Sequence, residues 1–115
     1  MADRVGRTGG ETPEMARLRR RIDTLDRKIV GLLNERAELG RDVGREKSAV
    51  GRRAIRDAER EREVLLRVTM ANTGPIPQAD LLAIYRGLMA ATRAIEARDR
   101  RRELPGPTIA TDDPT

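Results

Sequence analysis

Three cationic side chains fall on or beside the apolar stripe of a long amphipathic segment. Arg36 lies within the stripe, Arg19 lies beside it, and Lys47 continues it one turn beyond the last apolar position. A cation that faces an apolar interior costs several kcal/mol unless an anion meets it, so acids of this chain or an anionic ligand must supply the counter-charge. The apolar members of the stripe are Met15, Leu18, Ile22, Leu25, Ile29, Leu32, Leu33, Leu39 and Val43.

Carboxyl groups and one hydroxyl fall on the matching faces of two later segments. Glu61 precedes Val64 by one helical turn, and Glu96 follows Thr92 by one turn. Cations outnumber acids in the inward-facing set, which favours a pocket for a small polyanion such as a dicarboxylate, because guanidinium binds a carboxylate through two parallel hydrogen bonds. Taken singly, these residues also fit solvated side chains at a helix edge. The set comprises Arg19, Arg36, Lys47, Asp57, Arg60, Glu61, Thr92 and Glu96.

The composition narrows the classes of function. The chain has 115 residues, a formal net charge of +5, one tyrosine as its sole aromatic residue, and neither cysteine nor histidine. The positive charge favours an anionic partner: nucleic acid, anionic lipid, or a small carboxylate or phosphate. The missing residue types exclude disulfides, thiolate catalysis and the usual proton shuttle, so we expect no metal or cofactor site. With no apolar run of bilayer length and no signal-peptide pattern, we expect a cytoplasmic location.

Helical periodicity without strand-like alternation predicts an all-α fold with one long and two shorter helices. We expect a disordered tail over residues 1–12 and a long helix over 13–48, which Thr12 can cap. The second helix is expected between Asp57, its predicted cap, and residue 72, where a Gly-Pro pair ends it. The third is expected over residues 77–104.

The predicted first helix is too long for the rest of the chain to cover. At 1.5 Å per residue it spans roughly 50 Å. The other two helices can bury only part of its apolar stripe, so a partner chain is the natural cover. We therefore expect one helical domain over residues 13–104 that forms a dimer, followed by a flexible tail over 105–115.

The ordered series of motifs resembles the all-helical class of chorismate mutases over about residues 15–97. That resemblance implies a cofactor-free isomerase that converts chorismate to prephenate on the route to phenylalanine and tyrosine. It also implies an intertwined homodimer in which the long first helices cross between protomers. The matching pieces are Leu18-Arg19-x-x-Ile22-x-x-Leu25-Asp26, then Leu32-Leu33-Asn34-Glu35-Arg36 with Val43-Gly44-x-x-Lys47, and then Ile55-Arg56-Asp57-x-x-Arg60-Glu61.

The same resemblance implies roles for the residues that bind the substrate's carboxylates. Arg19 would reach into the partner's site and join Arg36 and Arg60 in holding the two carboxylates. Thr92 stands where the family often has serine, near one carboxylate.

Further roles implied by the resemblance concern the reacting bond and the ring. Lys47 and Glu96 would face the ether oxygen, Glu96 standing where many members have glutamine. Asp57, through its backbone, and Glu61 would hold the ring hydroxyl. The loop between Lys47 and Asp57 is about one residue longer than the family's common pattern.

Several alternatives remain open from the sequence. Relatives of this fold act on 4-amino-4-deoxychorismate or eliminate pyruvate from isochorismate. A basic helical dimer could instead bind nucleic acid through Arg45, Arg52, Arg53 and residues 98–102, although acids are interspersed and stacking aromatics are nearly absent. A coiled-coil scaffold is a third interpretation. The resemblance also admits a complex with the first enzyme of the shikimate pathway, and Met15 is an alternative start.

Overall fold

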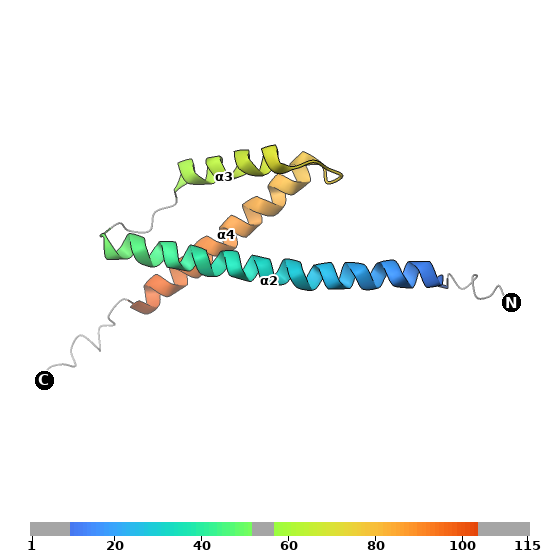
Figure 1. Cartoon of the computed structure of the whole chain (residues 1–115). Coiled ribbons are helices and arrows are strands. Elements are labelled where there is room, and N and C mark those ends of the chain that lie inside the picture. Colours follow the sequence, from blue (N-terminus) through green and yellow to red (C-terminus); the bar gives the residue numbers. More distant parts are fainter. Residues whose placement is uncertain (1–9, 52–56, 104–115) are drawn as a thin grey trace, which may run out of the picture. The chain divides into compact units, whose positions relative to one another are not determined.

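The computed structural model describes residues 10–51 and 57–103, and this part of the chain contains three α-helices and no strand. The helices are α2 (Pro13–Ala49), α3 (Ala58–Ala71) and α4 (Gln78–Glu103) (Figure 1). The predicted all-α class with one long and two shorter helices is therefore confirmed. Most of the predicted N-terminal tail, the predicted C-terminal tail and motif residues 55 and 56 lie outside the described residues. The chain divides into two compact units, one ending at Glu35 and one beginning at Arg36.

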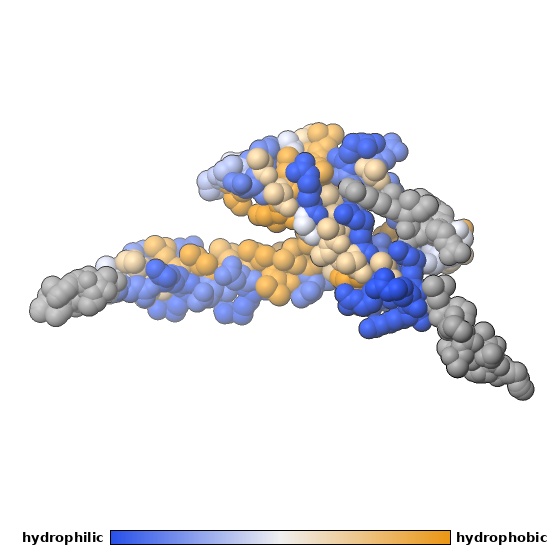
Figure 2. Space-filling model, turned by 180° about the vertical axis from the view of Figure 1, so that it is seen from behind, coloured by the Kyte–Doolittle hydropathy of each residue, from blue (hydrophilic) through white to orange (hydrophobic). Residues whose placement is uncertain are grey.

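The first unit contains the early turns of α2, whose start follows from local chemistry. Thr12 caps the helix, because its Oγ1 accepts a hydrogen bond from the backbone N–H of Met15 at 3.0 Å. The predicted apolar stripe is present and exposed in the single chain, with Ile22 54% and Leu25 55% accessible. Figure 2 shows this stripe as an apolar band along one side of α2, with hydrophilic residues along the other. The partner chain expected to cover it stays a prediction.

The second unit contains an antiparallel pair, α3 and α4, that pack against each other. Asp57 caps α3 as predicted, its Oδ1 accepting from the backbone N–H of Arg60 at 3.0 Å. At the other end of α3, Asn72 binds the turn that leads into α4. Its amide nitrogen donates to the Ile76 carbonyl at 3.0 Å, and its amide oxygen accepts from the N–H of Gly74 at 2.9 Å. Gly74 has φ +85°, a backbone conformation that suits a residue without a Cβ.

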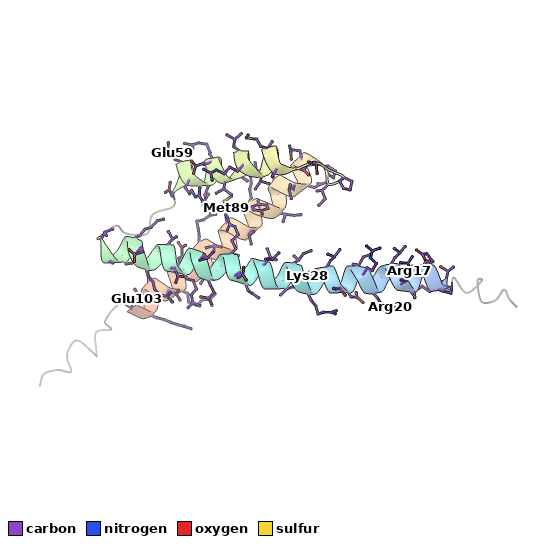
Figure 3. The ribbon with its side chains drawn as sticks, viewed as in Figure 1. Arg17, Arg20, Lys28, Glu59, Met89 and Glu103 are labelled. Atoms are coloured by element: carbon purple, nitrogen blue, oxygen red, sulfur yellow. The ribbon has the colours of Figure 1, made fainter. Side chains whose placement is uncertain are left out.

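The most deeply buried described residues lie on α4. Met89 and Thr92, one turn apart, are 6% and 9% accessible, and Figure 3 labels Met89 midway along the helix. Their neighbours on the predicted inner faces of α3 and α4 are half-buried, which agrees with the sequence periodicity. These neighbours are Val64, Leu65, Val68, Leu81, Leu82, Tyr85, Leu88 and Ile95.

Within the second unit, the last turns of α2 meet α4 at two glycines. A Cβ built at Gly40 would overlap the methyl group of Thr92, and one built at Gly44 would lie 3.2 Å from Cγ of Glu96. The absence of a side chain at both positions therefore allows the two helix backbones to approach closely. None of the helices formed by the described residues is long and apolar enough to cross a bilayer.

Candidate functional site

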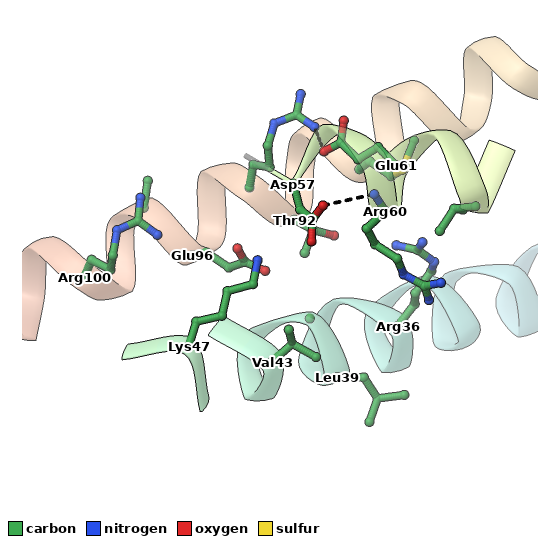
Figure 4. A pocket seen from close by; sticks show the side chains of 15 residues that line it. Arg36, Leu39, Val43, Lys47, Asp57, Arg60, Glu61, Thr92, Glu96 and Arg100 are labelled. Carbon is green, nitrogen blue, oxygen red and sulfur yellow. Dashed lines mark hydrogen bonds and ion pairs between the residues drawn. The ribbon is translucent and has the colours of Figure 1, made fainter. Parts of the chain in front are cut away.

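A pocket of about 560 Å³ lies within the second unit, between the last turns of α2, the start of α3 and the second half of α4 (Figure 4). Each of the three helices places its predicted inner face toward this space, so the pocket follows from the amphipathic pattern of each helix. The apolar part of the lining comes from Leu39, Val43, Val64, Met89 and Ala97.

Seven of the eight predicted site residues line this pocket. The eighth, Arg19, belongs to the first unit, where its side chain is 66% accessible and forms an ion pair with Glu11. Its predicted place in a partner's site stays a proposal. The seven lining residues are Arg36, Lys47, Asp57, Arg60, Glu61, Thr92 and Glu96.

Arg36 and Arg60 place their guanidinium groups on the same side of the pocket in Figure 4. Arg36 is half-buried, and its guanidinium carbon lies 5.7 Å from the centroid of the Tyr85 ring, within the range of a cation–π contact. Arg60 donates from Nη1 to Oε1 of Glu63 at 2.7 Å, one turn along α3. Both cations therefore have an internal partner while their charge remains available to a ligand.

Lys47 and Glu96 reach toward one another from α2 and α4 in Figure 4. Both side chains are half-buried and both line the pocket. Thr92 lies one turn before Glu96 on α4 and donates its hydroxyl hydrogen to the Leu88 carbonyl at 3.1 Å. The Thr92 hydroxyl can consequently offer a ligand its oxygen lone pair but not its proton in this conformation.

Two lining cations were missed by the sequence analysis as site residues, Arg93 and Arg100. Arg93 forms an ion pair from Nη1 to Oε2 of Glu61, and the two side chains are 35% and 15% accessible. The pair links α3 to α4 inside the lining. A signal was available, because a carboxylate on the inner face of a helix needs a counter-charge, and Arg93 lies one helical turn after Met89, which was assigned to the inner face of its own helix.

The charges of the lining are unbalanced. Five cations and three carboxyl groups are present among its fifteen residues, a formal excess of two positive charges. Charges in a partly apolar pocket are screened less than on the surface, so this excess favours a ligand with two negative charges. Across residues 10–51 and 57–103, no three His, Cys, Asp or Glu residues are grouped as metal ligands would be.

A family model described as chorismate mutase type II matches residues 18–97, a range that includes all eight predicted site residues. The chain belongs to this family. Bifunctional chorismate mutase/prephenate dehydratases from Aquifex aeolicus and Neisseria gonorrhoeae are 37% identical over 89 residues and 38% identical over 78 residues. These alignments cover 74% and 68% of the chain but 24% and 21% of the relatives, so the chain spans about a quarter of their length.

A solved structure gives the same family. The chorismate mutase (form II) of Thermus thermophilus is 30% identical to the chain, with a TM-score of 0.70. The match covers 74% of this chain and 96% of the Thermus chain. Nearly the whole of the Thermus chain therefore has a structural counterpart in this chain.

Beside the pocket of this chorismate mutase type II chain, a bidentate ion pair joins α2 to α4. Arg41 donates from Nε to Oδ2 of Asp99 at 2.9 Å and from Nη2 to Oδ1 at 3.2 Å. Their side chains are 30% and 17% accessible. The hydrogen bond from Arg41 lowers the pKa of Asp99, with smaller contributions from the charges of Arg41, Arg45 and Arg102. The same pair raises the pKa of Arg41.

We predict that this ion pair makes stability depend on acid pH. The pKa of Asp99 is lowered in the folded state. The contribution of the ion pair to the free energy of unfolding is therefore fully present above the pKa of Asp in the unfolded chain, about 3.9, and is lost as pH falls through the pKa in the folded state. Asp99→Asn should lower the free energy of unfolding at neutral pH and weaken its decline between about pH 5 and pH 2. Urea unfolding at fixed protein concentration across that range measures both effects.

Asp42→Asn is the matched control. Asp42 binds Arg45 at 2.8 Å within one helix, where both side chains are more than half exposed, so its loss should change stability little. Parallel pH profiles for the wild-type and Asp99→Asn chains would contradict the role given to Asp99.

Proposed function

We propose that this chain catalyses the rearrangement of chorismate to prephenate. The observation that carries the proposal is the excess of two positive charges around a partly apolar pocket, because chorismate bears two carboxylates. Membership of the chorismate mutase type II family and the similarity to the Thermus enzyme support it. The reaction breaks one C–O bond and forms one C–C bond within a single molecule. It therefore needs no nucleophile and no net transfer of a proton to or from the protein.

In this proposal, arginines hold the substrate in a reactive conformation. Arg36 and Arg60 bind its carboxylates from one side of the pocket, and Arg19 of a second copy completes the set. Thr92 lies beside one carboxylate, and its hydroxyl donates to that group only when it leaves the Leu88 carbonyl. Fixing both carboxylates brings the enolpyruvyl chain over the ring, which removes much of the entropic part of the barrier.

Lys47 and Glu96 act on the bond that breaks. Negative charge grows on the ether oxygen as the C–O bond lengthens, and a fixed ammonium group stabilises that charge more in the transition state than in the ground state. Glu96 assists only when protonated, because a carboxylate cannot donate a hydrogen bond and repels the developing charge.

The pairing of Glu61 with Arg93 favours chorismate over its 4-amino analogue. Glu61 and the backbone of Asp57 are proposed to hold the ring hydroxyl. With Arg93 beside it, Glu61 can still accept a hydrogen bond from a hydroxyl. An ammonium group in the same place would meet the guanidinium of Arg93, and like charges at close range are unfavourable.

We further propose that the chain works as an intertwined homodimer in the cytoplasm. The stripe on α2 supports this, because all nine of its large apolar side chains, from Met15 to Val43, are at least 37% accessible in the single chain. Val30, which lies outside the stripe, is exposed as well. Arg19 lies beside that stripe, which suits a residue donated across the interface. A complex with the first enzyme of the shikimate pathway is a further proposal, supported by the resemblance alone.

No observation favours the nucleic-acid alternative. Arg45 is ion-paired with Asp42, so the basic face is partly neutralised. Arg52 and Arg53 lie outside the described residues.

We predict that purified protein consumes chorismate and that Arg36→Ala lowers kcat/KM by roughly 100-fold or more, corresponding to about 3 kcal/mol of transition-state binding. The loss of chorismate absorbance measures both. Arg62→Ala, which removes an exposed cation from α3 outside the pocket, is the control and should stay near wild type.

Parallel assays decide between the related substrates and test the partner enzyme. Chorismate should be turned over faster than 4-amino-4-deoxychorismate or isochorismate, and adding the first enzyme of the shikimate pathway should raise the rate if the complex forms. Near-wild-type turnover by Arg36→Ala would mean that the pocket is misassigned.

We predict that Glu96→Gln keeps activity while Glu96→Ala loses it. The amide of glutamine always carries an N–H donor, whereas alanine removes the side chain and should lower kcat/KM by roughly tenfold or more. The loss of chorismate absorbance at one fixed pH compares the two variants. Equal losses in both would assign Glu96 another role.

We predict a sedimentation mass near twice the 12.9 kDa of the chain. Leu25→Asp places a charge in the centre of the apolar stripe and should shift the protein toward monomer, with loss of activity. Arg27→Asp introduces a carboxylate on the polar side of α2, with a larger change of charge, and should leave the dimer intact. A monomeric wild-type protein at micromolar concentration would refute the dimer.

A further inference from the structure

We propose that Gly40 and Thr92 form a size-matched pair that positions Glu96 for the reaction. Gly40 is a positioning residue in this assignment, and Thr92 takes part in it through its methyl group. The assignment rests on the proposed function of the pocket. Gly40 lies on α2 and Thr92 on α4, at the point where the two helices meet, and both line the pocket.

The contact between the two residues has no room for another carbon atom. A Cβ at position 40 would overlap Cγ2 of Thr92, and it would lie 3.8 Å from Cβ of Thr92 and 3.6 Å from Oε2 of Glu96. The methyl group of Thr92 therefore occupies the volume that a side chain at position 40 would need.

Thr92 cannot easily turn its methyl group away. Its hydroxyl donates to the Leu88 carbonyl at 3.1 Å, and the residue is 9% accessible. A helical threonine has two common χ1 rotamers, and the hydrogen bond to the carbonyl four residues earlier selects one of them. In that rotamer the methyl group faces Gly40.

The close approach of α2 and α4 also places Glu96 against α2, at Gly44, one turn after Gly40. Its Cγ would lie 3.2 Å, and its carboxyl carbon 3.4 Å, from a Cβ at Gly44. Lys47 follows Gly44 by three residues, so it projects from the adjoining turn. The distance between α2 and α4 at Gly40 therefore sets where the Glu96 carboxyl stands relative to the Lys47 ammonium group.

A methyl group at position 40 would push this part of α4 outward and carry Glu96 with it, because Thr92 and Glu96 are one turn apart on the same helix. Displacing a catalytic group by about 1 Å can cost on the order of 100-fold in rate. Arg36 and Arg60 lie on other turns, so binding of the carboxylates should suffer less than turnover.

The low helix propensity of glycine indicates that Gly40 serves the contact with Thr92. Glycine in a helix interior is less favourable than alanine, and α2 continues for nine residues beyond Gly40. Alanine at this position would stabilise the isolated helix. A change from Gly to Ala therefore raises the stability of α2 itself but creates a steric conflict with the methyl group of Thr92. Loss of activity without a matching loss of folding is therefore the expected signature.

Four proteins test the proposal: wild type, Gly40→Ala, Thr92→Ser and the double variant. Thr92→Ser removes Cγ2 and retains a hydroxyl that can bind the Leu88 carbonyl. Gly40→Ala should lower kcat by about tenfold to 100-fold in the Thr92 background, with a smaller change in KM. In the Thr92→Ser background the same change should cost less than about threefold.

Gly87→Ala is the matched control, because a Cβ at Gly87 on α4 meets nothing within 4 Å. It should keep the wild-type kcat, and thermal unfolding of all five proteins separates rate effects from folding effects. An inactive wild type would refute the proposed function and this assignment with it. An active wild type with no loss in Gly40→Ala, or with equal losses in both backgrounds, would refute the pair alone.

Discussion

Repulsion among cations is the constraint on which the pocket depends. Five positively charged side chains line one space, and without partners they would spread apart or draw in water. Arg36 lies over an aromatic ring, Arg60 binds an acid of its own helix, and Arg93 binds Glu61 across two helices. These partners hold three of the five cations before any ligand arrives, and the lining still has an excess of positive charge. Such preorganisation makes the electrostatic effect on a reacting bond large, since little rearrangement is needed during the reaction.

The scaffold that supports this arrangement is the meeting of α2 with α4. Two glycines allow the backbones to approach, and the Arg41–Asp99 ion pair binds the same helices beside the pocket. The steric and the electrostatic features act together, because the short approach brings Arg41 within reach of the Asp99 carboxylate. Lys47 and Glu96 then face each other across a distance that neither helix could set alone.

Much of this structure could be predicted from the sequence because it is periodic. The caps at Thr12 and Asp57 and the apolar spacing defined three helices, and Arg36 was identified because apolar residues flank it along the stripe. Arg93 was not identified as a site residue, since its place in the lining depends on an ion pair with a residue 32 positions away on another helix. Periodicity describes one helix at a time and says nothing of how two helices approach.

The contact between Gly40 and Thr92 also constrains how such a chain can change over generations. A residue larger than glycine at position 40 conflicts with the methyl group of Thr92. A side chain can be gained on α2 only after the methyl group on α4 has been lost, while the opposite order passes through an overcrowded protein. Substitutions at these two sites are therefore expected to occur in a preferred order. Lineages in which position 92 has lost its methyl group can accept side chains at position 40 that other lineages cannot.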